Sequence, residues 1–232
     1  MELTPRPLAD QISTEEDVFM NSFDAQIHKG FNDRSPEPKA IGIGGSPRKG
    51  GNSDVLLKHI LKGVSENQII ADKVQLRDYQ YQACIGCESC RKDKICTGLN
   101  DGMSLLYPKI FEAKGLILVS PTHNYNVTAW MKAFIDRLYC FYNFDSNRPR
   151  GWSSQLSDQG RKAVLAAVCE QKNKDDMGFT LDAMRLPLEA LGYEIIGELA
   201  VFGIFDRGKV QEKKEILIKA AKLGSDLAKS IL

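Results

Sequence analysis

No stretch of this 232-residue chain is apolar for long enough to cross a membrane as a helix. The opening residues Met1–Pro7 also lack the apolar core of a secretory signal. Neither charge dominates, because 31 Lys and Arg stand against 30 Asp and Glu, for a formal net charge of +1. A nucleic-acid or membrane-surface binder needs a concentrated basic patch. We therefore expect a cytoplasmic protein that binds neither nucleic acid nor membrane.

The sequence is also poor in the residues of acid–base catalysis. It contains three histidines, which are far apart at His28, His59 and His123. No Ser/His/Asp or paired-carboxylate grouping of the kind that hydrolases use is recognisable. An isolated loop histidine such as His123 is more often a surface or polar-contact residue than a general base. We accordingly predict no catalytic side chain.

Cysteine, in contrast, is concentrated. Four of the six cysteines lie within thirteen residues, spaced C-x2-C-x2-C-x5-C at Cys84, Cys87, Cys90 and Cys96. Thiolates at intervals of three can face one point from a tight loop, as in iron–sulfur proteins. A structural zinc site more often uses two separated Cys-x2-Cys pairs. In a reducing compartment such cysteines are metal ligands or redox groups more often than disulfides, so the run indicates redox chemistry.

Hydrophobic periodicity predicts strands that alternate with helices from residue 39 onward, after a polar arm at 1–38. The expected strands are 40–44, 69–76, 115–120, 162–168 and 195–202, and the expected helices are 53–64, 101–113, 128–139, 176–191 and 210–232. Five such units indicate a doubly wound α/β sheet of parallel strands, in the order 2-1-3-4-5, with helices on both faces. Ligands of such sheets bind beyond the carboxyl ends of strands 1 and 3.

The loop after the first strand, Gly44–Ser53, has the composition of an anion site. Its glycines allow close backbone approach, and the amides of the following helix favour a negative charge. We expect Asn52 or Ser53 to cap that helix. Ser46, Asn52 and Ser53 add polar side chains and Arg48 adds a charge, which together suit a phosphate monoester. The alternative is an ordinary glycine-rich turn.

Two better-known nucleotide motifs are absent from the same loop. Gly-x-Gly-x-x-Gly starting at Gly42 fails because position 47 is proline, and no Gly-Lys-Ser/Thr follows at the offset that the Walker pattern needs. The sequence therefore disfavours a dinucleotide fingerprint and a P-loop NTPase.

The loop after the third strand reads Ser120-Pro-Thr-His-Asn-Tyr-Asn126. Pro121 shapes this loop because its ring fixes φ. Thr122 and Asn124 are suited to line the edge of a flat heterocycle, and Tyr125 is suited to pack against a ring. His123 lies among them.

Four further features allow more than one interpretation. The arm at 1–38, with one helix expected from about Thr14, is either a flexible extension or a segment that packs on a partner subunit. The aromatic stretch 141–152 covers a ligand, meets another subunit or simply packs under a loop. The cations Arg91, Lys92 and Lys94 either favour the reduced state of a cluster or form a solvated basic turn. We interpret Cys140 and Cys169 as buried core residues.

Several segments together resemble the NADPH-dependent FMN reductase-like branch of the flavodoxin superfamily, and the cysteine spacing is most similar to that of its iron–sulfur flavoproteins. The resemblance extends over residues 39–232, as one flavodoxin-like FMN-binding domain with the cysteines at 84–96. The segments that carry it are Gly45-Ser-Pro-Arg-Lys-Gly-Gly-Asn-Ser53, the Cys84–Cys96 run, Asn100-Asp-Gly-Met103, Ser120-Pro-Thr and Met131-Lys-Ala-Phe-Ile-Asp-Arg137.

The resemblance implies FMN bound without a covalent link. Its phosphate would lie on Ser46, Arg48, Asn52 and Ser53, and its ring against Pro121, Thr122, His123, Asn124 and Tyr125. It also implies Cys84, Cys87, Cys90 and Cys96 as ligands of a [4Fe–4S] cluster. Relatives usually form homodimers or homotetramers in which a neighbouring subunit completes the flavin site.

The chain departs from the family pattern at three places. Gly102 replaces a second aspartate, His123 occupies a position that is often aromatic, and the arm at 1–38 is additional.

The resulting interpretation is an FMN-dependent oxidoreductase that passes electrons between NAD(P)H or a reduced carrier such as ferredoxin and a small-molecule or quinone acceptor, through FMN and the cluster. Two alternatives remain open. One is a flavin reductase whose cysteines are empty or hold zinc, and the other is a flavodoxin-like electron carrier without a substrate of its own.

Overall fold

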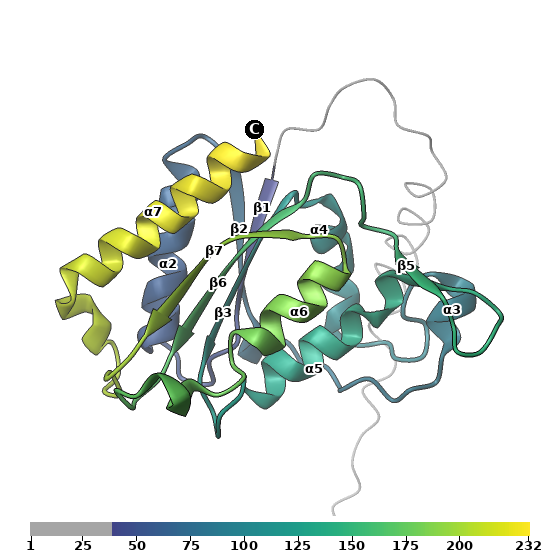
Figure 1. The fold of residues 1–232 in the computed structure, drawn as a ribbon, viewed down its shortest axis with the longest axis horizontal. Coiled ribbons are helices and arrows are strands. Elements are labelled where there is room, and N and C mark those ends of the chain that lie inside the picture. The colour runs from purple at the N-terminus through teal and green to yellow at the C-terminus, as the bar shows by residue number, and fades with distance from the viewer. Residues whose placement is uncertain (1–38) are drawn as a thin grey trace, which may run out of the picture. The chain divides into compact units, whose positions relative to one another are not determined.

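The computed structural model describes residues 39–232, and the expected helix near Thr14 lies outside that range. Its centre is a five-stranded parallel sheet in the order β2-β1-β3-β6-β7 (Figure 1). The strands are β1 (Lys39–Gly44), β2 (Ile70–Gln75), β3 (Gly115–Pro121), β6 (Lys162–Val168) and β7 (Glu194–Val201). Counted along the chain this is the order 2-1-3-4-5, so the predicted doubly wound topology is confirmed.

Helices cover both faces of the sheet (Figure 1). One face carries α2 (Asn52–Ser65) and α7 (Lys214–Ile231), and the other carries α4 (Tyr107–Glu112), α5 (Ala129–Arg137) and α6 (Asp182–Ala190). The central strands β3 and β6 are apolar almost throughout because both of their faces are buried. Each face therefore has its own apolar core.

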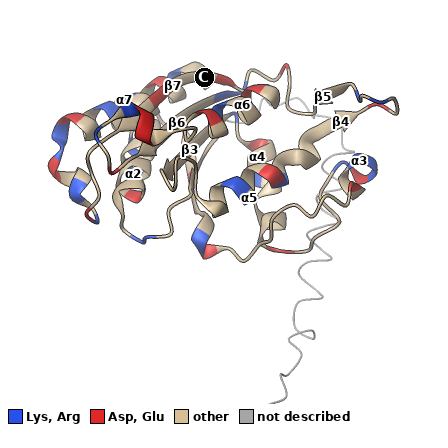
Figure 2. Ribbon diagram, turned by 60° about the horizontal axis from the view of Figure 1, so that its bottom comes forward, with Lys and Arg blue, Asp and Glu red and all other residues tan. Residues whose placement is uncertain are grey.

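The helices α2 and α7 approach closely through a reciprocal pair of glycines. A Cβ atom on Gly63 would lie 1.9 Å from the carbonyl oxygen of Ala221, and one on Gly224 would lie 1.8 Å from that of Ile60. The two backbones can therefore touch only because both positions lack a side chain. Basic and acidic residues are interspersed along α7 (Figure 2).

Several sequence-based boundaries are wrong for identifiable reasons. The expected helix 101–113 is a 3₁₀ turn (Gly102–Leu105) followed by α4, because Pro108 suits the first turn of a new helix and not the middle of a long one. The expected helix 176–191 is likewise divided by Gly178, whose φ is +54°. The expected cap at Asn52 or Ser53 is also wrong, because the N-cap of α2 is Gly51.

The aromatic stretch near 141–152 is more regular than the sequence indicates. It forms an antiparallel hairpin of β4 (Tyr142–Phe144) and β5 (Trp152–Ser154), which lies beside the short helix α3 (Ser89–Asp93) (Figure 1). Cys140 and Cys169 are buried in the core, as predicted. Within residues 39–232, no helix has both the length and the apolar character that a bilayer crossing requires.

Candidate functional site

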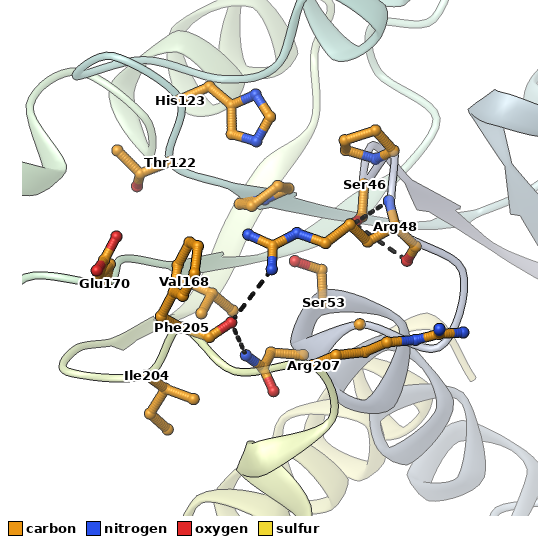
Figure 3. A pocket seen from close by; sticks show the side chains of 14 residues that line it. Ser46, Arg48, Ser53, Thr122, His123, Val168, Glu170, Ile204, Phe205 and Arg207 are labelled. Atoms are coloured by element: carbon orange, nitrogen blue, oxygen red, sulfur yellow. Dashed lines mark hydrogen bonds between the residues drawn. The ribbon is translucent and has the colours of Figure 1, made fainter.

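A pocket of about 150 Å³ opens at the carboxyl edge of the sheet, where the topology predicts a ligand site (Figure 3). The loops after β1, β3, β6 and β7 contribute its walls. Its lining comprises Ser46, Pro47, Arg48, Gly51, Asn52, Ser53, Pro121, Thr122, His123, Val168, Glu170, Ile204, Phe205 and Arg207. Seven of the nine residues predicted to hold FMN are in this set, and Asn124 and Tyr125 are not.

The loop between β1 and α2 presents the helix start to the pocket. The Ser46 hydroxyl accepts the amide of Arg48 at 3.2 Å, and the Arg48 carbonyl accepts the amide of Gly51 at 3.1 Å. No side chain caps α2, so its first amides keep their capacity to donate to a ligand. Ser53 is buried beside them. This arrangement suits an anion, because the helix start carries a partial positive charge.

An ion pair that is largely shielded from solvent stabilises the loop between β1 and α2. Both terminal nitrogens of Arg77 donate to the Asp54 carboxylate, at 3.0 and 2.8 Å. Arg77 Nη1 also donates to the carbonyl of Ser46 at 3.0 Å, while Asp54 Oδ2 accepts the amide of Gly50 at 2.8 Å. The pair therefore ties the loop to the first turn of α2 and to the end of β2. Sequence reasoning missed it, because residues 54 and 77 meet only once β2 lies beside β1.

The loop after β7 forms a wall that sequence reasoning also missed. The guanidinium of Arg48 lies 4.5 Å from the ring centroid of Phe205, and Arg207 adds a second cation to the pocket. The Asn52 side chain donates to the carbonyl of Asp206 at 3.0 Å and accepts the amide of Val210 at 3.0 Å. Asn52 therefore fastens this loop to α2. The available signal was the position of the loop, since it follows a parallel strand of the same sheet.

The loop after β3 makes a tight turn. His123 and Asn126 exchange backbone hydrogen bonds of 2.8 and 3.1 Å, and Asn124 and Tyr125 between them have φ of +49° and +63°. Two consecutive positive φ values are typical of a type I′ turn. The backbone of Gly178 packs against Tyr125 and leaves no space for a Cβ atom there. The turn is therefore held by the segment that precedes α6.

Burial, followed by the nearby charge of Arg48, lowers the pKa of His123 below its ordinary value of 6.5. The imidazole is therefore neutral at pH 7, where it can offer a hydrogen bond but no charge to a ligand.

A second pocket, of about 310 Å³, is lined by the four clustered cysteines. All four thiols are free, with Cys84 and Cys87 exposed and Cys90 and Cys96 half-buried. Burial raises the pKa of Cys90, and the charges of the other three cysteines raise it further. A hydrogen bond from Ser89 lowers the pKa of Cys87.

The four thiols at this pocket supply a donor set of the kind that an iron–sulfur cluster uses. In the described range 39–232, no three Cys, His or carboxylate groups converge closely enough to hold one ion. Gly98 leaves space for the thiol of Cys87, because a Cβ atom at position 98 would lie only 2.3 Å from Cys87 Sγ. Four soft thiolates around one pocket are the donors that a cluster requires.

The basic residues of the cysteine segment do not all form a solvated turn. Arg91 is 20% exposed, donates to the hydroxyl of Tyr139 at 2.8 Å and lies 4.6 Å from the ring centroid of Phe144. The alternative of a solvated turn is therefore wrong for Arg91, whereas Lys92 and Lys94 are exposed. Arg91 joins the cysteine segment to the β4–β5 hairpin.

Comparisons with known proteins agree with this geometry. A sequence model of the NADPH-dependent FMN reductase family matches residues 38–172. An iron-sulfur flavoprotein of Archaeoglobus fulgidus is 32% identical over 192 residues, which are 83% of this chain and 80% of that protein. An iron-sulfur flavoprotein of Methanocaldococcus jannaschii is 37% identical over 99 residues, which are 43% of this chain and 51% of that protein.

Solved structures show the same fold at lower identity. An FMN-dependent NADH-azoreductase of Bacillus anthracis, solved with FMN, superposes with a TM-score of 0.61 at 19% identity, over 82% of this chain and 99% of the other. A flavodoxin from the domain Archaea gives a TM-score of 0.50 at 13% identity, over 83% of this chain and 98% of the other. With a family match over more than half of its length, the chain belongs to the NADPH-dependent FMN reductase family and is an FMN-dependent, flavodoxin-like oxidoreductase.

Proposed function

We propose that this chain transfers electrons between NAD(P)H or a reduced carrier such as ferredoxin and a small-molecule or quinone acceptor, through FMN and a [4Fe–4S] cluster. The observation that carries the proposal is that one chain has both an anion-binding helix start at the sheet edge and a separate pocket lined by four free cysteines. FMN supplies two-electron or one-electron chemistry, and a cluster supplies one-electron chemistry.

In this proposal the phosphate of FMN binds the uncapped amides of α2, with Ser46 and Ser53 as hydroxyl partners. Arg48 and Arg207 supply positive charge from two different loops. Asn52 acts mainly by fastening the Arg207 loop, since its amide already contacts Asp206 and Val210.

The flavin ring would lie against the loop of Pro121–Tyr125, whose residues Pro121, Thr122 and His123 line one side of the same pocket. A pocket of about 150 Å³ is smaller than the roughly 300–1,000 Å³ typical of ligand sites, so it fits the phosphate end and not the whole cofactor. We propose a homodimer or homotetramer in which a second subunit covers the ring.

The cysteines Cys84, Cys87, Cys90 and Cys96 would hold the cluster. The names of the relatives from Archaeoglobus fulgidus and Methanocaldococcus jannaschii support this assignment. The protein part of the chemistry is to present thiolates and to limit access of water, for which the aromatic hairpin β4–β5 is well situated beside α3.

A second candidate is a flavin reductase without a cluster. It is favoured by the absence, among residues 39–232, of any three metal-ligating groups that converge on one point. Isolation under anaerobic conditions, followed by iron, sulfide, zinc and FMN analysis, separates the two. The proposal predicts about four irons and four sulfides per FMN. Zinc, or FMN with no iron, would eliminate the cluster.

Steady-state assays distinguish an enzyme from an electron carrier. The protein is offered NADH, NADPH or chemically reduced ferredoxin with a quinone as acceptor. Turnover with at least one donor is expected. If every donor reduces the flavin only once and no acceptor sustains turnover, the chain is a carrier and not an oxidoreductase.

A further inference from the structure

The cysteine segment leaves the folded core at Gln82 and returns to it at Asp101, and one buried side chain joins these two points. This residue is Arg137, in the last turn of α5, which is 2% exposed. Its Nη1 donates to the Gln82 carbonyl at 3.0 Å and to Asp101 Oδ2 at 2.7 Å, and its Nη2 donates to Asp101 Oδ1 at 3.1 Å. The guanidinium therefore bridges the two ends of the loop, beside a backbone hydrogen bond of 2.8 Å from the Gly102 amide to the Gln80 carbonyl.

The carboxylate of Asp101 completes the closure. It accepts the amide of Gln82 at 3.0 Å and that of Met103 at 3.1 Å, in addition to the two bonds from Arg137. The remaining Arg137 nitrogen, Nε, donates to the hydroxyl of Tyr107 at 3.1 Å. All three guanidinium nitrogens therefore have acceptors. A planar guanidinium is suited to this geometry, which a lysine cannot reproduce.

Arg137 also lines the cysteine pocket, so the closure is adjacent to the thiols it would organise. We infer that Arg137 is a positioning residue of the iron–sulfur centre, which keeps the four cysteines directed at one pocket by holding Gln82 and Asp101 together. The inference rests on the proposed function, because only a bound cluster makes this arrangement of cysteines useful. Residues that orient metal ligands commonly change metal affinity by about 10- to 100-fold when they are replaced.

If Arg137 only stabilised the fold, replacing another buried arginine should release iron equally fast. A second buried arginine can test this alternative. Arg161 is 3% exposed and donates to the carbonyls of Ile110 and Ala113 at 2.9 and 2.6 Å. It is not among the residues that line the cysteine pocket. Arg161→Lys therefore removes a comparable buried guanidinium from the same face of the sheet without opening the cysteine loop.

The experiment compares Arg137→Lys, Asp101→Asn, Arg161→Lys and the wild-type protein after anaerobic reconstitution with iron and sulfide. We expect the first two variants to release iron to a chelator about 10- to 100-fold faster than the wild type while keeping FMN. Asp101→Asn preserves the shape of the side chain, so it supplies the result if Arg137→Lys does not fold. Iron retention equal to the wild type in the folded loop variants, or equally fast loss in Arg161→Lys, would overturn the inference.

A cluster-free measurement separates this inference from the proposed function. Hydrogen exchange of the amides of Gln82 and Met103 is followed in the iron-free protein, because both amides donate to Asp101. Faster exchange in Arg137→Lys than in Arg161→Lys is expected, and equal exchange contradicts the closure whether or not iron binds. A wild-type protein that takes up no iron refutes the cluster instead, and the exchange rates then decide whether the loop is held as described.

Discussion

The phosphate loop (residues 44–53) and the cysteine loop (residues 84–96) are each stabilised by an arginine that is shielded from solvent. In both cases the guanidinium donates two hydrogen bonds to the carboxylate of an aspartate. In the first, Arg77 binds Asp54, and in the second, Arg137 binds Asp101. The first pair lies between the ends of adjacent strands and the first turn of α2. The second pair closes a long excursion whose cysteines are exposed or half-buried.

The difference shows how much each site depends on distant residues. The phosphate loop is shaped largely by its own strand, turn and helix, so the pair beneath it reinforces a local structure. The cysteine loop has one short helix, α3, between residues in left-handed conformation at Glu88 and Lys94, and Arg137 of α5 supplies part of its closure. A substitution at one arginine–aspartate pair should therefore impair the site that this pair supports and leave the other site intact.

The largest expected effect concerns the pair beneath the phosphate loop. Asp54→Ala leaves the largely buried Arg77 without a carboxylate, although the Ser46 carbonyl and Gln75 Oε1 remain as acceptors. It should lower the free energy of unfolding by about 3 kcal/mol. FMN affinity should fall as well, because the Gly50 amide loses its acceptor. Urea unfolding and flavin titration measure these effects.

The matched control is Asp72→Ala, which breaks an ion pair with Lys109 whose side chains are about half exposed. It should cost under about 1 kcal/mol. Equal stability losses in Asp54→Ala and Asp72→Ala would show that the Asp54–Arg77 ion pair stabilises the fold no more than the surface ion pair does.

The next effect concerns the cysteine loop alone. Gly98→Ala introduces a methyl group into the space beside Cys87 Sγ, so iron content after reconstitution should fall on the order of tenfold while FMN binding is preserved. Lys222→Ala, at an exposed position of α7 on the other face of the sheet, is the control. Full iron occupancy in Gly98→Ala would show that Cys87 can move aside without loss of the cluster.

An effect of at least similar size, on flavin binding, is expected from Arg48→Ala combined with Asn52→Ala. The first change removes a charged donor from the phosphate and the second releases the loop that carries Arg207. Because a hydrogen bond to a charged group contributes about 1.5–3 kcal/mol, FMN affinity should fall by roughly 10- to 100-fold. Lys132→Ala, on the exposed face of α5, is the control and should leave FMN affinity unchanged. An unchanged affinity in the double variant would place the phosphate elsewhere.

The smallest effect depends on pH. Burial acts to raise the pKa of Asp101, but hydrogen bonds from Arg137 and from the amides of Gln82 and Met103 outweigh it and lower the pKa overall. A lowered folded pKa stabilises the fold above the unfolded value of about 3.9, and this contribution is lost as the pH falls through the lower folded value. The stability advantage of the wild type over Asp101→Asn should therefore narrow on acidification below about pH 4, as urea unfolding of the iron-free proteins would reveal. A constant difference would contradict the shifted pKa.

The regular part of the fold was predictable because its signals are local. Continuous apolar strands such as Gly115–Pro121 indicate burial on both faces, and the Gly44–Ser53 loop has the composition of a strand–helix turn. The breaks before α4 and α6 were missed because Pro108 and Gly178 interrupt helices whose apolar spacing continues across them.

The tertiary partners were not predictable from one sequence. Asp101 and Arg137 lie in two separate motifs, and nothing in either motif indicates that they pair. Phe205 and Arg207 are ordinary loop residues until β7 brings them to the sheet edge beside Arg48. Sequence reasoning identified the loops that we propose to bear the chemistry and missed the contacts that hold those loops in place.

The central claim is that the phosphate of FMN binds the start of α2, and a comparison of FMN with riboflavin tests it most directly. Riboflavin lacks the phosphate, so the flavin-free wild-type protein should bind FMN at least about 100-fold more tightly, and Arg48→Ala with Asn52→Ala should reduce that ratio by at least about tenfold. Equal affinity of the wild-type protein for the two flavins would contradict the account.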